Sequence, residues 1–261
     1  MLVFSLVLFA AIVLGSIVYR YDLYNKEPWY LLLMTAGLGM LTGYGSGLVE
    51  EQLIEAWNIS YDEPLGMAWL AGTVEELAKV LVVVAVAFVF RSKFDDPQDG
   101  QIYGAFAGLG AAIIESRVYL TLGAPELATA GTEFARLLLH LLLGGIGGYG
   151  IGLARFRIRG WAWKLPASVT AAVVLHSAWD WACGLPAQLG EITMAPRYLA
   201  VGLMLTTLLL FGIMTHLGTQ HAAAALKPRR LRTLFGWPFN LIFRSRPEHV
   251  PRNDDDAPTE P

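Results

Sequence analysis

Long apolar stretches alternate with short polar ones along the chain, and this pattern predicts a bundle of membrane-spanning helices. A helix needs about 20 mostly apolar residues to cross the hydrocarbon core of a bilayer. We therefore expect an all-α fold, a polytopic transmembrane helix bundle of about seven spans. The predicted spans are roughly 2–19, 29–48, 65–90, 101–122, 133–153, 165–185 and 197–217. The first is interpreted as a retained span because it lacks a basic n-region and a small-residue cleavage site.

The basic residues predict an orientation for these spans. Lys and Arg follow the first, third, fifth and seventh segments, whereas the acidic loop after the second and the loop after the fourth have none. The loop after the sixth segment has only Arg197. Cytoplasmic loops of membrane proteins are enriched in Lys and Arg. The N-terminus is therefore predicted to lie outside and the C-terminus in the cytoplasm.

Composition leaves little room for a soluble domain, because 55% of residues are hydrophobic and 16% are charged. Soluble domains average about 25% charged residues. A single cysteine, Cys183, excludes an internal disulfide and a cysteine-based zinc cluster. We expect a transmembrane domain over residues 1–221 and a basic interfacial segment over 222–246 that contacts anionic lipid. Residues 247–261 are expected to be a disordered polar tail, and no nucleic-acid partner is expected.

Charged residues inside the apolar segments are the feature that points to chemistry. A charge at the centre of a bilayer costs several kcal/mol, yet the third segment holds Glu75, Glu76 and Lys79. At 1.5 Å per residue, the polar residues of four segments lie roughly 8–17 Å below the predicted outer face. We expect them to converge on one site. The other members of this set are Glu115 in the fourth segment, His140 in the fifth, and His176 and Asp180 in the sixth.

Spacing within the helices suggests which groups pair. Glu75 and Lys79 are at positions i and i+4, which predicts an ion pair. Glu76 points about 100° away, and without that partner it is the expected general base. The pair His176 and Asp180, also i and i+4, presents an imidazole and a carboxylate on one helix face. Two arginines near the outer helix ends, Arg117 and Arg136, are expected to snorkel to the interface.

These residue types leave several functions open. Glutamates and histidines in a dry site suit acid–base catalysis, but they also mark proton- or ion-coupled transporters. A bis-histidine haem protein with His140 and His176 as axial ligands is a third reading. The absence of a visible internal repeat is atypical of transporters. If the site is catalytic, two mechanisms stay open. Either His140, His176 and Glu115 hold Zn²⁺, or a glutamate deprotonates water directly. The HExxH motif, which would have favoured zinc strongly, is absent.

Five sequence blocks, in order, resemble the PrsW family of intramembrane proteases, within the CAAX-protease and bacteriocin-processing group. The similarity covers about residues 19–184. Two positions beside Glu115 depart from the family pattern: Ala111 stands where Phe is common, and Ser116 where Asn is common. The blocks are "YRYDLYNKEPWYLLL", "VEELAK", "DDPQDGQIYGAFAGLGAAIIES", "RLLLHLLLGGIGGYGIGLAR" and "VLHSAWDW".

The resemblance implies an intramembrane endopeptidase of a bacterial plasma membrane. It implies cleavage of a membrane-anchored protein near the outer face, and regulated cleavage of an anti-sigma factor is a role linked to the family. The transmembrane domain would then be a protease domain. By the same resemblance the catalytic set is Glu75, Glu76, Lys79, Glu115, His140, His176 and Asp180.

Overall fold

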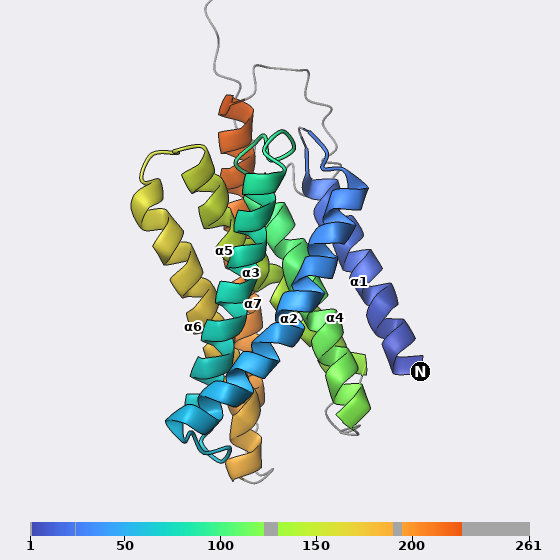
Figure 1. Ribbon diagram of the computed structural model, residues 1–261, viewed down its shortest axis with the longest axis vertical. Coiled ribbons are helices and arrows are strands. Elements are labelled where there is room, and N and C mark those ends of the chain that lie inside the picture. The colour runs from blue at the N-terminus through green and yellow to red at the C-terminus, as the bar shows by residue number, and fades with distance from the viewer. Residues whose placement is uncertain (1, 24, 123–129, 190–194, 226–261) are drawn as a thin grey trace, which may run out of the picture. The chain divides into compact units, whose positions relative to one another are not determined.

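A computed structural model describes residues 2–23, 25–122, 130–189 and 195–225. Within these residues the chain forms seven α-helices and no strand, which confirms the predicted all-α bundle (Figure 1). The helices are α1 (Leu2–Tyr21), α2 (Trp29–Trp57), α3 (Pro64–Val89), α4 (Asp99–Leu122), α5 (Ala130–Arg155), α6 (Trp161–Leu189) and α7 (Ala195–Ala225).

Four of the described helices are long and apolar enough to cross a membrane by length and composition: α1, α2, α5 and α7. The other three, α3, α4 and α6, have 26, 24 and 29 residues. These three carry most of the polar residues that the sequence singled out. Six of the seven candidate catalytic residues therefore lie on helices outside this set of four, with His140 on α5 the exception. The orientation of the bundle stays a prediction.

Helix α2 extends furthest past a predicted end, because it continues to Trp57 rather than ending near residue 48. The segment interpreted as an acidic outer loop is therefore helical over its first half. Its Glu, Gln, Leu and Ala residues are good helix formers. The helix ends at Asn58, whose left-handed backbone (φ 52°) closes the last turn with hydrogen bonds to the carbonyls of Glu55 and Ile54.

The centre of the bundle is the contact between α4 and α5, where glycines let the two backbones approach closely. A Cβ atom added at Gly104 would lie 2.1 Å from the carbonyl oxygen of Gly144. One added at Gly108 would lie 1.9 Å from the carbonyl oxygen of His140. Small residues at this spacing are a packing device of membrane helices. The contact fixes the position of His140 relative to α4.

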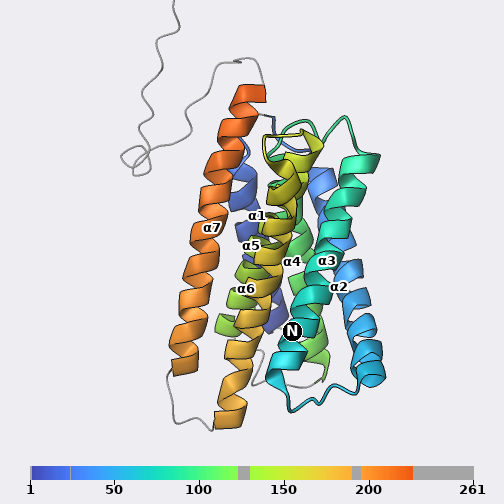
Figure 2. The same ribbon diagram turned by 90° about the vertical axis from the view of Figure 1, so that its left-hand side faces the viewer.

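Helices α3 and α6 also approach closely. A Cβ atom added at Gly72 would lie 2.3 Å from the hydroxyl oxygen of Ser177. This contact sets one turn of α3, with Glu76, beside the turn of α6 that holds His176. In Figure 2, α7 lies at one edge of the helical unit and α2 at the opposite edge, with the helices of the site between them. Beyond residues 222–225, which end α7, the predicted interfacial segment and polar tail lie outside the described residues.

Candidate active site

Four helices bring the polar residues of the apolar segments together in one cluster. The rings of His140 and His176 lie edge to face, with centroids 5.0 Å apart. Each ring contacts a carboxylate from a neighbouring helix, Glu115 for His140 and Glu76 for His176. The predicted convergence of these four side chains is confirmed. The cluster lies in the half of the bundle that the Lys and Arg pattern predicts to face outward.

Glu76 is the most deeply buried carboxylate of the cluster, at 1% exposed. The Lys79 ammonium donates a hydrogen bond to Glu76 Oε1 over 2.6 Å. His176 Nδ1 lies 2.7 Å from the same oxygen. Lys79 Nζ also lies 3.6 Å from Glu75 Oε2, which confirms the predicted ion pair. The expectation that Glu76 has no charged partner is wrong, because positions i and i+3 are neighbours on a helix as much as i and i+4.

His140 has two nitrogens in different surroundings. Its Nε2 lies 3.0 Å from Glu115 Oε2. Its Nδ1 lies 3.6 Å from Glu75 Oε2, which is too long for a hydrogen bond. This Nδ1 is buried and has no hydrogen-bond partner. Buried polar atoms normally have one, so Nδ1 of His140 is an unused ligand atom that faces Glu75.

His176 leaves its second nitrogen on the open side of the cluster. Since Nδ1 is held by Glu76, Nε2 is the free position, and it lies 3.3 Å from Asp180 Oδ2. The Asp180 side chain is 34% exposed, the largest exposed fraction among the carboxylates of the cluster's ion pairs. Water and substrate therefore have better access at Asp180 than at Glu76.

Arg136 belongs to the cluster although the sequence analysis placed it at the interface. Its Nε lies 3.2 Å from Glu115 Oε1, and its guanidinium also pairs with Glu133. The guanidinium carbon lies 4.5 Å from the centre of the Tyr119 ring. The snorkelling interpretation is wrong for Arg136, whose side chain is 15% exposed. The sequence did contain a signal for this placement. Arg136 is four residues before His140, so the two side chains lie on the same face of the helix.

Glu50 on α2 is a second residue that the sequence analysis missed. Its Oε1 is buried and has no hydrogen-bond partner. Its carboxyl group lies within electrostatic range of four ionisable members of the cluster, Glu75, Glu115, His176 and Asp180. The sequence analysis missed Glu50 because it interpreted residues 49–64 as a loop. In the structure α2 continues to Trp57, and Glu50 lies on this helical continuation.

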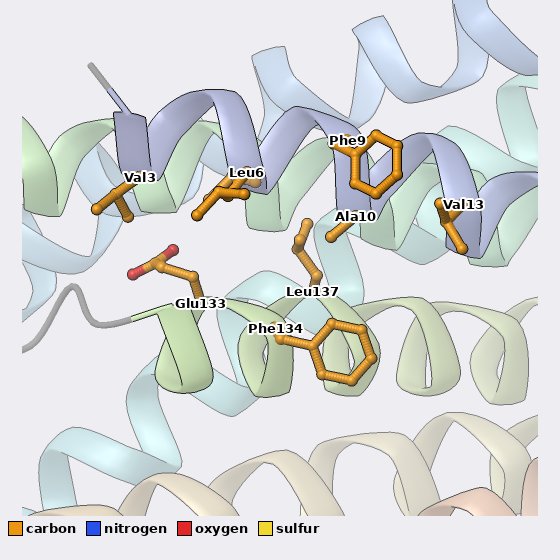
Figure 3. Close-up of a pocket in the computed structure, with 9 residues that line it drawn as sticks. Val3, Leu6, Phe9, Ala10, Val13, Glu133, Phe134 and Leu137 are labelled. Atoms are coloured by element: carbon orange, nitrogen blue, oxygen red, sulfur yellow. The ribbon is translucent and has the colours of Figure 1, made fainter.

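An apolar groove of about 300 Å³ lies between α1 and α5 near the cluster. Figure 3 shows Phe134 and Leu137 of α5 facing Leu6 and Ala10 of α1 across it, with Glu133 at one end. Because Glu133 pairs with Arg136, and Arg136 with Glu115, a chain of ion pairs separates the groove from His140.

Within the described residues, Glu75, His140 and His176 form a group whose ligand atoms all lie within 4.8 Å of one another. Two imidazoles and a carboxylate are the protein ligands of many catalytic zinc sites. Glu115 lies beside Nε2 of His140, and Glu76 lies beside Nδ1 of His176, so the other nitrogen of each ring is left for a metal. Carboxylates in these places match the outer-shell partners that orient metal-bound histidines. The residues present therefore fit a metal ion, with Glu75 rather than Glu115 as the carboxylate that shares a 4.8 Å ligand group with both rings.

Comparison with known proteins bears on what this cluster does. The sequence model of the PrsW family, described as intramembrane metalloproteases, matches residues 27–213. Protease PrsW of Geobacillus kaustophilus is 31% identical over 176 residues, which are 65% of this chain and 74% of that protein. Protease PrsW of Bacillus subtilis is 29% identical over 65% of this chain and 77% of that protein. No solved structure gives a significant match.

Proposed function

Because the chain belongs to the PrsW family of intramembrane metalloproteases, we propose that Glu75, His140 and His176 hold its catalytic metal ion. The chain is thus an intramembrane protease of the bacterial plasma membrane, rather than the transporter or haem protein that the sequence left open. The observation that carries the proposal is the unpartnered Nδ1 of His140, which faces Glu75 inside a three-residue ligand group.

The donor set favours Zn²⁺. Imidazole nitrogens and one carboxylate suit zinc, whereas magnesium and calcium prefer oxygen ligands alone. When bound, the ion would supply Lewis-acid activation of the scissile carbonyl and of the attacking water. The remaining residues of the cluster act by orienting ligands and by moving protons.

Two charge pairs, one buried and one half-buried, orient the histidines. Glu76 holds Nδ1 of His176 and is itself held by Lys79. Glu115 holds Nε2 of His140 and is itself held by Arg136. In each pair the basic side chain keeps the carboxylate ionised, and the carboxylate fixes the ring and its tautomer. Glu76, expected from the sequence to be the base, takes a positioning role in this proposal.

Asp180 is the proposed proton acceptor for the hydrolytic water. It lies beside Nε2 of His176, the nitrogen that Glu76 leaves free. It is the most accessible carboxylate of the ion-paired cluster, and no Lys or Arg pairs with it among the described residues. A carboxylate not tied to a cation is a stronger base than one beside an ammonium. Asp180 would take the proton from water as it attacks the carbonyl, then give it to the leaving amine.

The substrate is a membrane protein, and we propose a membrane-anchored one such as an anti-sigma factor. Two observations support this class. The polar cluster lies between helices rather than in an extramembrane domain, so the scissile bond has to reach it at membrane depth. The Lys and Arg pattern sets the cluster in the outer half, where a membrane-anchored regulator would be cut near its outer side.

The test is cleavage by matched variants. Membrane proteomes of cells with wild type and with Asp180→Asn are compared, and fragments present only with wild type identify the substrate. The purified substrate is then assayed with wild type, Asp180→Asn, Glu75→Gln and the exposed control Glu55→Gln. We expect at least about a 100-fold lower kcat for Asp180→Asn with metal content unchanged, no cleavage by Glu75→Gln, and full activity of the control. Full activity of Glu75→Gln would refute the ligand set, and full activity of Asp180→Asn would refute its role.

A further inference from the structure

A second group of carboxylates lies at the opposite end of the helices from the candidate active site. It joins the α1–α2 connection to the α3–α4 connection, about 70 residues apart in the chain. Asn25 Nδ2 donates a hydrogen bond to Asp95 Oδ2 over 2.6 Å. The Tyr103 hydroxyl donates to Glu27 Oε2. From Glu76 to the end of α3 is 13 residues, so this group is about 20 Å from the active-site cluster.

Three aspartates form the core of this group. Asp95, Asp96 and Asp99 offer oxygens that all lie within 4.8 Å of one another. The backbone folds tightly around Asp99, because its Oδ2 accepts hydrogen bonds from the N–H groups of Asp95 and Asp96. Oδ1 of Asp95 and Oδ1 of Asp99 are buried and have no hydrogen-bond partner. Two oxygens of the core are therefore free for a ligand.

Glu27 gives independent support from a separate part of the chain. Its side chain is 2% exposed, and Oε1 has no hydrogen-bond partner. Its carboxyl group is within hydrogen-bonding reach of Asp99, so the unpartnered oxygen belongs to the same enclosure. A buried carboxylate oxygen without a partner is costly, and this one belongs to a carboxyl group that lies next to that of Asp99.

No basic side chain compensates this charge among the described residues. None of the four carboxylates forms a salt bridge with a Lys, Arg or His of that part of the chain. The nearby Lys26 turns its ammonium to the carbonyl oxygens of Tyr19 and Asp22 and lies over the Tyr19 ring. Unpaired buried carboxylates need either a cation or a proton.

We propose that Glu27, Asp95, Asp96 and Asp99 form a second metal site, for a hard divalent cation such as Mg²⁺ or Ca²⁺. The donors are all oxygens, as these ions require. The absence of histidine and cysteine disfavours zinc. A cation here ties the α1–α2 connection to the start of α4, and α4 carries Glu115 of the catalytic cluster. The site is structural and does not depend on the proposed catalytic mechanism.

The test measures thermal unfolding of the purified full-length protein in detergent after chelation. MgCl₂ and CaCl₂ are titrated separately, with NaCl added to hold the ionic strength constant. We expect a saturable rise in Tm of roughly 5 °C at 100 times the Kd for the resident ion. The ion with the lower Kd identifies the resident cation. No saturable rise with either ion would overturn the proposal and assign the site to bound protons.

Variants localise the effect. Glu27→Gln combined with Asp95→Asn should raise the Kd for the cation at least about tenfold, since two of the three unpartnered oxygens belong to the altered groups. Asp95→Asn alone serves if the double variant does not fold, because Asp95 is only half-buried and its partner Asn25 is exposed. The matched control is Glu55→Gln, an exposed acidic residue of α2. A Kd equal to wild type in the Asp95→Asn and double variants would place the cation elsewhere and refute the site.

Discussion

The two ends of this helix bundle bury carboxylates in opposite ways. At the catalytic cluster, the carboxylates of Glu75, Glu76 and Glu115 each lie near a basic side chain, with Lys79 and Arg136 as the permanent cations. At the acidic site that joins the α1–α2 and α3–α4 connections, the carboxylates have no such partner among the described residues. The first end therefore carries its counter-ions in its own sequence, and the second obtains them from solution.

This difference has a consequence for catalysis. A cluster that neutralises its own charge keeps its carboxylates ionised without a bound ion, so its histidines stay oriented whether or not a metal is present. A cluster without internal cations responds to pH and to divalent ions instead. The catalytic end is thus expected to be rigid and the acidic end to be sensitive to its surroundings.

Removing Lys79 should have the largest effect on stability. Lys79→Met removes the ammonium that lies beside Glu75 and Glu76, while Glu76 stays 1% exposed. Breaking a buried ion pair by removing one partner costs about 3–5 kcal/mol. We expect the free energy of unfolding in detergent to fall by about that amount, with Lys93→Met as the exposed control. A Lys79→Met protein as stable as wild type would show that the ion pairs of Lys79 with Glu75 and Glu76 do not stabilise the folded protein.

Removing one carboxylate should lower stability at the catalytic end but not at the acidic end. Glu76→Gln deprives Lys79 and His176 of their charged acceptor and should lower the free energy of unfolding by about 1–3 kcal/mol. Asp96→Asn keeps an acceptor for the N–H group of Gln98 and removes an uncompensated charge. In chelator it should leave stability unchanged or raise it by up to about 1 kcal/mol. An equal loss of unfolding free energy in both variants would contradict the proposed difference between the two ends.

Arg136 tests whether the internal cations serve the histidines. Arg136→Met frees Glu115, which then holds His140 less firmly. Loss of such an outer-shell partner typically costs about 10–100-fold in metal affinity or activity. We expect an effect of that size on zinc affinity, measured by competition with a chelator. The control is Arg117→Met, because the Arg117 side chain contacts Thr121 at the surface. Unchanged zinc affinity in Arg136→Met would remove Arg136 from the site.

The acidic end should also respond to pH when divalent ions are chelated. Burial raises the pKa of Asp22 and of Glu27 to about 7, from ordinary values near 4. Between about pH 4 and pH 7 the folded protein therefore binds more protons at these groups than the unfolded chain does. Stability from these groups should fall as pH rises through that window. The measurement is Tm against pH in chelator, and Glu27→Gln should flatten the slope; a slope of the opposite sign would contradict the assignment.

The sequence was sufficient for the fold and for seven members of the cluster, and insufficient for Glu50, for Arg136 and for the pairing. Long apolar segments can satisfy their backbone in a membrane only as helices, and charges such as Glu75 and Glu115 stood out by their cost. The closer partner of Lys79, which is Glu76, could not be predicted, because i+3 and i+4 neighbours compete on a helix. Glu50 was missed because the end of α2 was placed too early.

The central claim is that Glu75, His140 and His176 hold the catalytic metal, and its most direct test is metal content. Wild type, Glu75→Gln and the control Glu55→Gln are purified in the same detergent, and their metal is quantified by mass spectrometry alongside Tm. The account predicts about one zinc per chain in wild type and control, and less than about a tenth of that in folded Glu75→Gln. Zinc retained at one per chain in Glu75→Gln would contradict it.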